Sequence, residues 1–461
     1  MSPLHPSQIE RSISRLNETA YGVPQPNSAD FRRIISNGVA LADEQKAWAD
    51  DANYDQGSDV PTDKWMTTIG ASVPFTPDFC FQDIGYFLKD GLGGYAVAGS
   101  SPTFVHTFTP QSMATSRQLP SRTYLERIAG LDLTMFPSIV QTRGQISSSK
   151  LGRISTSFQY EGSGAQSTNP AGYSSPSVTQ DREWAYASQV PFIRLYDPTV
   201  GTAQLETATA AGTATATANM NAVITSAQIP GSPVTVQVPI TTGDTATVWA
   251  AKVRTALANV AAITTYFDVS GTGTSIVLTS RKRLANDATL NIALNAGTTG
   301  ITAAPTSTHT TAGVVGDNQD YTCDLENWNL SWNLPPADPG YRTCSPYVIA
   351  DQPRSGQTRS EFLVGSRSFT FTAGARLAAG DKTHAWMQKG TVVQLEIPIV
   401  GIDANNNYLK IVHQRAIIDD AKRVPNLGGF VGINLSLDLM SNSGTFPLTA
   451  ILQNDVTSYA T

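Results

Sequence analysis

The chain has 461 residues, of which 15% are charged, and its formal net charge at pH 7 is −6. This length allows two or three domains, and the absence of a basic excess disfavours tight binding to nucleic-acid phosphates. The 36 Gly and 27 Pro, with 40% hydrophobic residues, favour short strands joined by many turns. We therefore expect a mainly β protein.

Targeting and cysteine signals are weak. The first 30 residues lack an apolar core of signal-peptide length, and no window reaches the roughly 20 apolar residues of a spanning helix, so we expect a protein kept in the cytosol where it is made. The cysteines Cys80, Cys323 and Cys344 show no C-x-x-C spacing. This pattern argues against a disulfide framework or a zinc site and predicts buried or idle thiols.

Residues 1–60 are expected to form an irregular N-terminal arm with an acidic loop and a helical tendency around Pro6–Asn17. One interpretation is a solvated surface loop, and the other is a segment that lets DNA slide past without adhering. The same role is considered for an acidic pair near the C-terminus. The candidate acidic residues are Asp43, Glu44, Asp50, Asp51, Asp55, Asp59, Asp419 and Asp420.

Residues 61–202 are predicted to form a first β domain. Alternation from Trp65 to Val73 predicts a half-buried strand, and a helix is expected from Pro77 to a stop at Gly91. Strands are also expected at Thr103–Thr109 and Ser138–Ile146. The clearest alternation runs from Arg153 to Tyr160, which is typical of an antiparallel sheet with one wet face.

Residues 203–315 are predicted to be an inserted surface domain. The composition changes abruptly, because residues 207–218 are all Ala or Thr except Gly212. A strand at Val234–Ile240 and a helix at about Thr245–Asn259 follow, then strands near Ser275–Thr279 and Thr289–Leu294. We expect a small α+β or immunoglobulin-like fold that is large enough to fold alone.

Residues 316–461 are predicted to form a second β domain. Trp328, Leu330, Trp332 and Leu334 alternate with polar residues, and a polar loop rich in Arg and Gly is expected over 351–367. The further elements expected here are a strand at Phe369–Ala373, a helix from Asp381 to Gly390, and strands at Val393–Ile399, Tyr408–Val412 and Val431–Leu439.

Residues 65–164 and 366–444 share an order of elements: a strand, a short helix ending in Gly, two strands, a loop and a clearly alternating last strand. The matched ends are Phe158-Gln-Tyr-Glu-Gly-Ser-Gly and Leu437-Asp-Leu-Met-Ser-Asn-Ser-Gly. This order predicts an internal duplication whose two cores are left intact by the insert. Two unrelated β domains could also match by chance.

Taken together, these segments resemble the tail-tube (major tail) proteins of siphophages. The resemblance is carried by Trp65–Gly94, by Thr103–Pro110 with Gln118–Glu126, and by Lys150–Gly164. In the insert, Gly231–Ile240 followed by Gly243–Arg254 is similar to modules of phage tail proteins. The resemblance covers about three quarters of the chain, and the order of its pieces is more specific than any one piece.

The resemblance implies two antiparallel β-sandwich or barrel domains, each with a short flanking helix, in a non-catalytic virion protein of a long non-contractile tail. Chains of this family form stacked sixfold rings that enclose a channel for DNA delivery into the host. The apparent duplication favours a trimeric, pseudo-sixfold ring over a hexamer. Implied partners are the tape measure, tail terminator and distal tail proteins, with DNA passing unbound and no membrane.

Motifs for chemistry were sought and not found. The five histidines have no metal-ligand spacing, and Gly91–Gly94 and Gly271–Gly273 fit neither dinucleotide nor phosphate-loop patterns. No G-x-S-x-G elbow occurs, and the adjacent Asp419 and Asp420 would point apart on a strand. We expect no catalytic, cofactor or metal site.

Two other classes of function stay open. A capsid decoration protein or a baseplate hub component would share the β content and the insert. A carbohydrate-binding adhesin would use exposed aromatic residues, and the pairs Trp328 with Trp332 and Trp48 with Trp65 were considered for that role. Same-face tryptophans on a strand are more often core residues, so we expect these to be buried.

Overall fold

The computed structural model describes most of the chain. The residues outside the description are 1–8, 27–29, 37–40, 52–62, 101–102, 113, 115, 129–131, 180, 302–306, 323, 338–340, 348–355, 360, 403–406, 428–429, 443–445 and 460–461. The described residues form 27 β-strands and four α-helices, and nearly all ladders are antiparallel, so the expected mainly β class is confirmed. No helix among them is long and apolar enough to cross a membrane.

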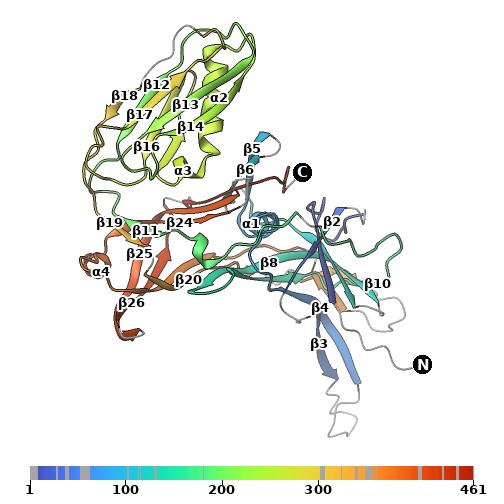
Figure 1. Ribbon diagram of the computed structural model, residues 1–461. Coiled ribbons are helices and arrows are strands. Elements are labelled where there is room, and N and C mark those ends of the chain that lie inside the picture. Colours follow the sequence, from blue (N-terminus) through green and yellow to red (C-terminus); the bar gives the residue numbers. More distant parts are fainter. Residues whose placement is uncertain are drawn as a thin grey trace.

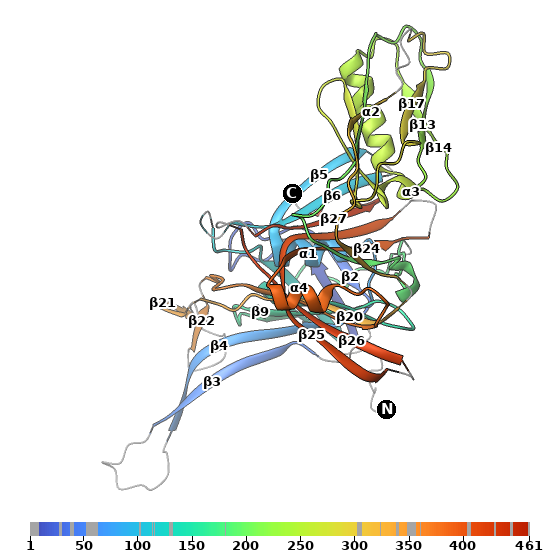
Figure 2. The same cartoon turned by 90° about the vertical axis from the view of Figure 1, so that its left-hand side faces the viewer.

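The described part of the first half contains ten strands and one α-helix. Its elements are β1 (Ile9–Ser14), β2 (Phe31–Ile34), β3 (Asp43–Asp51), β4 (Asp63–Phe75), α1 (Ile84–Leu92), β5 (Gly93–Ser100), β6 (Thr103–Pro110), β7 (Arg122–Ile128), β8 (Leu133–Ser149), β9 (Ser155–Gly162) and β10 (Ser167–Thr168). The β3–β4 hairpin extends away from the body of the molecule (Figure 2).

Two sequence predictions for this half were wrong. The described part of residues 1–60 is not an irregular arm, because Ile9–Ser14 is a strand that pairs with both β2 and β7. The strand was missed because its buried polar residues Arg11, Ser12 and Ser14 lie on both faces and break the alternation. Helix α1 starts later than expected, at Ile84, and ends at Leu92, with Gly93 rather than Gly91 as the glycine that follows it. Gly93 has φ +88°, a conformation that glycine adopts without strain.

The second half begins with β11, before the insert, and continues after it. Its elements are β11 (Ile193–Tyr196), β19 (Asn318–Tyr321), β20 (Leu325–Asn333), β21 (Tyr341–Tyr347), β22 (Gly356–Arg359), β23 (Ser368–Arg376), α4 (Thr383–Lys389), β24 (Val392–Val400), β25 (Tyr408–Leu427), β26 (Phe430–Leu439) and β27 (Leu448–Asn454). Sequence analysis missed β27, and it treated as loop the residues that form β22. β22 has only four residues, and in β27 apolar residues occur on both faces, so neither gives a clear sequence alternation.

The two halves carry the same set of strand pairings. In the first half β1 pairs with β2 and β7, β7 with β8, β8 with β9 and β10, and β9 with β4, which pairs with β3. In the second half β11 pairs with β19 and β24, β24 with β25, β25 with β26 and β27, and β26 with β23, which pairs with β20. Every pairing in the first set has a counterpart in the second.

Strand irregularities give the alignment of the halves. β8 has a register shift in its ladder with β7 and another in its ladder with β9. The shift against β9 lies between Gln141 and Arg143. β25 has corresponding shifts against β24 and β26, the second between Ile418 and Asp420. When both bulges are aligned, Tyr160 and Leu437 occupy equivalent positions in the two halves. The sequence comparison, which aligned Phe158 with Leu437, was therefore wrong by two residues. Among the described strands of the second half, the β5–β6 hairpin has no counterpart.

The two halves are joined edge to edge. β8 pairs with β20 from Arg143–Asn333 to Ser149–Asn327, which makes one continuous sheet in the order β3-β4-β9-β8-β20-β23-β26-β25. One hydrophobic cluster extends from Ile13 to Tyr459 through both halves. The expectation that each half keeps a separate core was therefore wrong, because the shared sheet covers a shared interior.

Helix α1 packs on the inner side of this sheet. Its Asp90 carboxylate is fully buried and accepts bonds from Arg122 Nε at 2.6 Å and from the Tyr160 hydroxyl at 2.9 Å. A buried charge requires such partners, because desolvation of an unpaired carboxylate is costly. Burial raises the pKa of Asp90, and Arg122 opposes that rise. The network ties α1 to β7 and β9.

The insert forms a separate lobe (Figure 1). One of its sheets has the order β15-β16-β12-β18 and the other β14-β13-β17. Its own hydrophobic cluster includes Trp249, Val253 and Leu257 of α2. The elements are β12 (Leu205–Thr209), β13 (Ala218–Thr225), β14 (Val234–Ile240), α2 (Ala246–Ala258), α3 (Ala261–Thr264), β15 (Phe267–Ser270), β16 (Ser275–Ser280), β17 (Asn291–Asn295) and β18 (Thr308–Thr311).

Charged residues connect the insert to the body. Arg281 Nη1 lies 2.8 Å from Glu396 Oε1, and Lys410 Nζ lies 2.9 Å from Asp268 Oδ1. Lys282 pairs with Asp320, which also binds Arg194 Nε at 2.8 Å. Burial raises the pKa of Asp320, but Arg194 and Lys282 outweigh it, so the pKa lies below its ordinary value. The insert is thus held by an ionic contact.

Candidate functional site

The outer face of the continuous sheet is polar. In β20, Trp328, Leu330 and Trp332 are buried while the residues between them face outward, and β9 and β23 show the same alternation. The outward residues of the five central strands are Ser155, Ser157, Gln159 and Glu161 of β9; Arg143, Gln145, Ser147 and Ser149 of β8; Asn327, Asn329, Ser331 and Asn333 of β20; Ser368, Thr370, Thr372 and Gly374 of β23; and Asn434, Ser436 and Asp438 of β26. We call this surface the polar face.

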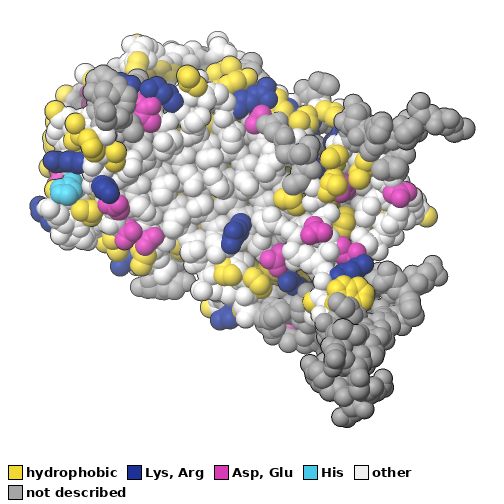
Figure 3. Space-filling view, turned by 90° about the horizontal axis from the view of Figure 1, so that it is seen from below, with side chains coloured by type: hydrophobic (Ala, Val, Ile, Leu, Met, Phe, Trp, Pro, Cys, Tyr) yellow, Lys and Arg dark blue, Asp and Glu magenta, His cyan; other side chains and the backbone are white. Residues whose placement is uncertain are grey.

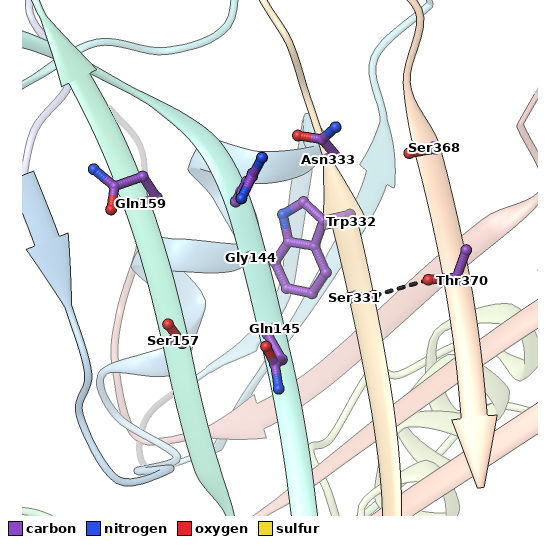
Figure 4. A pocket seen from close by; sticks show the side chains of 10 residues that line it. Gly144, Gln145, Ser157, Gln159, Ser331, Trp332, Asn333, Ser368 and Thr370 are labelled. Carbon is purple, nitrogen blue, oxygen red and sulfur yellow. Dashed lines mark hydrogen bonds between the residues drawn. The ribbon is translucent and has the colours of Figure 1, made fainter. Parts of the chain in front are cut away.

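Uncharged side chains cross the polar face in rows. One row joins Ser157, Gln145, Ser331 and Thr370 on four neighbouring strands, and Ser331 Oγ lies 2.8 Å from Thr370 Oγ1 (Figure 4). The next row is Ser155, Ser147, Asn329, Thr372 and Ser436. The first row borders a shallow depression of about 420 Å³. Both rows pass from one half of the chain to the other without a charged group.

Charged groups of the polar face lie around these rows. Glu161 binds Arg359 Nη1 at 2.7 Å, and Arg143 and Asp438 are exposed. In space-filling view a broad surface of uncharged polar atoms separates the charged side chains (Figure 3). Hydroxyl and amide groups can form hydrogen bonds with water but supply no net charge. Such a face can lie beside a polyanion without holding it electrostatically.

The joint beneath the rows is interlocked. Trp332 of β20 is 4% exposed and lies over Gly144 of β8, where an added Cβ would be 2.1 Å from the ring carbon Cε2. The indole Nε1 donates a hydrogen bond to Gln141 Oε1 at 2.9 Å, so the ring is fixed in place. Gly144 is therefore required because the Trp332 ring from the neighbouring strand occupies the space of a side chain at this position.

The two outer strands of the sheet are β3 and β25. β3 pairs with β4 alone among the described strands, and beyond Ile418 the strand β25 pairs with β26 alone in the same set. Helix α4 contacts this edge of β25. The backbone N–H of Ala421 donates to Met387 Sδ at 3.2 Å, and His384 Nδ1 lies 3.4 Å from the Ala421 carbonyl oxygen.

The structure distributes the predicted acidic residues over different places. Asp43 is exposed opposite Ser72, and Asp420 is exposed opposite Ser436 on the same side of the sheet. Asp419 is exposed at the bulge beside it. Glu44 points to the other side of β3, where Lys46 Nζ lies 2.8 Å from its carboxylate.

The remaining four acids cannot be placed as fully. Asp50 and Asp51 lie on β3 opposite Lys64 and Asp63, and their side chains are outside the description. Asp55 and Asp59 lie outside the described residues altogether. The prediction of one acidic loop is thus replaced, for the described part, by acids spread along β3 and β25. Sequence analysis missed the neutral rows, although the alternation in β9 and β20 pointed to them.

Two histidines are buried in strands of the body. His106 binds the Tyr95 hydroxyl at 2.9 Å and Asn454 Oδ1 at 3.1 Å, and burial lowers its pKa to about 4. His413 is also buried, with its pKa lowered to about 4 by burial. Cys80 is buried, and burial raises the pKa of its thiol. These are packed interior groups.

The tryptophans divide into two kinds. Trp328 and Trp332 are core residues, as expected. Trp48 was wrongly expected to be buried and is 51% exposed on β3, and the side chain of Trp65 is outside the description. Within the described part of the chain, no three His, Cys, Asp or Glu side chains are grouped as a metal site.

Comparison with known proteins adds no family assignment. Neither a scan against protein-family models nor a search of the curated proteins finds a match for this chain.

Proposed function

We propose that the chain is the tail-tube subunit of a long non-contractile phage tail, a structural virion protein that assembles with copies of itself around a DNA channel. The observation that carries this proposal is the polar face, with uncharged rows that span both halves. A channel wall must let the phosphate backbone pass, and fixed basic groups would hold it in a salt-dependent manner.

The repeated ladders support a ring built from half-chains. Each half offers four strands to the sheet, and the β8–β20 joint shows one way in which two such units meet. Three chains would then supply six units, which matches the sixfold symmetry implied by the resemblance. Closing a ring would also remove the unpaired edges of β3 and β25, which are a liability for a free monomer.

In this arrangement the polar face lines the channel and the insert lies on the outside. The insert is attached on the side of the body away from the polar face (Figure 1). The tape measure, terminator and distal tail proteins are the further partners that the resemblance implies, and the assembled protein would reside in the virion. DNA would pass without specific binding.

Electron microscopy of the purified protein tests this proposal. We expect tubes or stacked rings. Particles that stay monomeric, or trimers that never stack, would count against the proposal.

A comparison of DNA retention by wild-type and variant tubes tests the channel wall. Wild-type tubes should retain little DNA at moderate salt, whereas tubes of the double variant Thr372→Lys and Ser436→Lys should retain it in a salt-dependent way.

A further inference from the structure

We propose that the edge of β25 pairs with the edge of β3 from a second copy of the chain, in a register that sets Lys422 beside the partner subunit's Asp43. This inference rests on the proposed self-assembly and gives it a specific contact. The β8–β20 joint provides the template, because it is the place where one half of the chain already meets the other by antiparallel pairing.

The first step is the equivalence of β8 and β25. Gln145 of β8 lies opposite Ser157, and Lys422 of β25 lies opposite Asn434. Both pairs follow a bulge at the same distance along the strand, after Gln141 in β8 and after Ile418 in β25. Lys422 therefore occupies in the second half the position that Gln145 occupies in the first.

The second step is the equivalence of β20 and β3. Ser331 lies opposite Thr370, which lies opposite Asp438 on β26. Asp43 lies opposite Ser72, which lies opposite Glu161 on β9. Glu161 and Asp438 follow Tyr160 and Leu437, which correspond in the alignment of the halves, so Asp43 occupies the position of Ser331.

The template then specifies the contact. Within the chain, Gln145 pairs with Ser331 across the joint. Between chains the same register pairs Lys422 with the partner subunit's Asp43, and a neutral pair is replaced by two opposite charges. Both residues are exposed in the single chain. Opposite charges directly across an antiparallel ladder stabilise it, and like charges there destabilise it.

A neighbouring pair fits as well. Ser147 and Asn329 pair in the joint, and the same register, continued two residues before the start of β3, sets Val424 opposite the partner subunit's Leu41. Leu41 is 42% exposed in the single chain, and Val424 is half-buried at the edge. Pairing would therefore cover an exposed apolar side chain beside the ion pair, which is a second point of complementarity carried by the same register.

Pairing at this edge of β25 requires that helix α4 give up its contacts with Ala421. Ala421 corresponds to Gly144, which faces Trp332 in the joint. In the single chain its backbone groups contact Met387 Sδ at 3.2 Å and His384 Nδ1 at 3.4 Å. A sulfur acceptor and a long contact are weak hydrogen bonds, so a strand can replace them. These contacts protect the edge until a second copy arrives.

Charge reversal tests the register. Lys422→Asp and Asp43→Lys, each alone, should raise the protein concentration needed for assembly by roughly tenfold or more, because each ring contains several such contacts. The double variant should restore assembly toward the wild-type concentration. Lys252→Asp, on α2 of the insert, is the matched control and should leave assembly unchanged.

The outcomes separate the two proposals. If the wild-type protein never assembles, the tail-tube proposal fails. If it assembles but the single reversals have no effect, or the double variant stays unassembled while it is folded by circular dichroism, the register is wrong.

A cysteine pair gives an independent measurement. Tubes of the variant with Asp43→Cys and Lys422→Cys should be linked into covalent oligomers on oxidation, because directly opposite residues approach within disulfide range. Gln45→Cys with Lys422→Cys is the off-register control. Equal linking in both variants, or linking in the control alone, would overturn the proposed register.

Discussion

The joint between the two halves and the contact between insert and body are built in opposite ways. The joint is a strand ladder with Trp332 fixed over Gly144 and uncharged rows above it. The insert is held by Arg281–Glu396, Lys410–Asp268 and Lys282–Asp320. One contact is apolar and hydrogen-bonded along a backbone, and the other is ionic.

This difference indicates which parts of the molecule must act together. Separating the halves would expose backbone groups and a shared core, so they should unfold as one unit. Separating the insert exposes the charges of these three ion pairs, which water can solvate, and the insert has its own core. The body should therefore be the unit that carries assembly, with the insert as an attached lobe.

The largest expected effect is at the joint. Trp332→Ala should lower the free energy of unfolding of the body by about 3–5 kcal/mol, because it removes a buried indole from a close-packed site. Guanidinium unfolding followed by circular dichroism measures the change. Trp48→Ala is the control, since Trp48 is 51% exposed, and should cost within about 0.5 kcal/mol. Equal costs would contradict the interlocked joint.

Breaking the ionic contact should have the next largest effect. Arg281→Ala leaves the buried Glu396 with Arg194 at 3.4 Å, so we expect a loss near 3 kcal/mol, the lower end for a broken buried pair. Calorimetry should show the insert melting apart from the body. Lys252→Ala, which removes a partly exposed pair with Asp244, should cost no more than about 1 kcal/mol. A single unchanged transition in Arg281→Ala would argue against an ionic attachment.

Filling the notch at Gly144 tests the joint from its other side. Gly144→Ala places a Cβ 2.1 Å from Trp332 and should cost about 1–3 kcal/mol through overpacking. Because the clash is with one side chain, the same substitution should cost less in the Trp332→Ala background. Additive costs in the double variant would show that the two residues are not coupled.

Mild acid should weaken the body more than the insert. The folded-state pKa values of His106 and His413 are lowered to about 4 by burial, below the unfolded value of about 6.5. Their neutral forms are favoured in the fold, so stability present above pH 6.5 is lost as pH falls toward 4, by up to about 3 kcal/mol per histidine at about 1.4 kcal/mol per pKa unit. Unfolding midpoints measured from pH 7 to pH 4 check this, and a His106→Gln variant should flatten the dependence.

Removal of the insert should have the smallest effect on assembly. Thr202 and Val314 exchange two backbone hydrogen bonds of 3.0 Å, so the two connections of the insert lie side by side. A short linker replacing 203–315 should therefore leave the body folded, and tubes should still form. Loss of tubes from a deletion variant whose body remains folded would show that the insert takes part in assembly.

Sequence patterns predicted the strands whose two faces differ most. β9 and β20 alternate between apolar and polar residues, and the helix ending at Gly390 combines a core Trp386 with a glycine stop, so these elements could be placed closely. β1 was missed because buried Arg11 and Ser12 break its alternation. Their burial depends on β2 and β7, which a local pattern does not reveal.

The candidate site was only partly predictable for the same reason. The outward Ser, Asn and Gln residues could be read from single strands, but their continuity depends on the β8–β20 pairing between residues far apart in the sequence. The sequence indicated an acidic loop from a local run of acidic residues. In the structure Asp43 and Asp420 lie on the two opposite outer strands of one sheet. The order of elements in the sequence indicated a duplication. The residue-by-residue alignment of the two halves required the bulges in β8 and β25.

Rotationally averaged electron microscopy of assembled protein viewed along the tube axis tests the central claim most directly. Two equivalent halves per chain and one insert per chain predict a sixfold wall bearing three outer lobes. A wall with six lobes at equal spacing, or particles with no channel, would contradict the account.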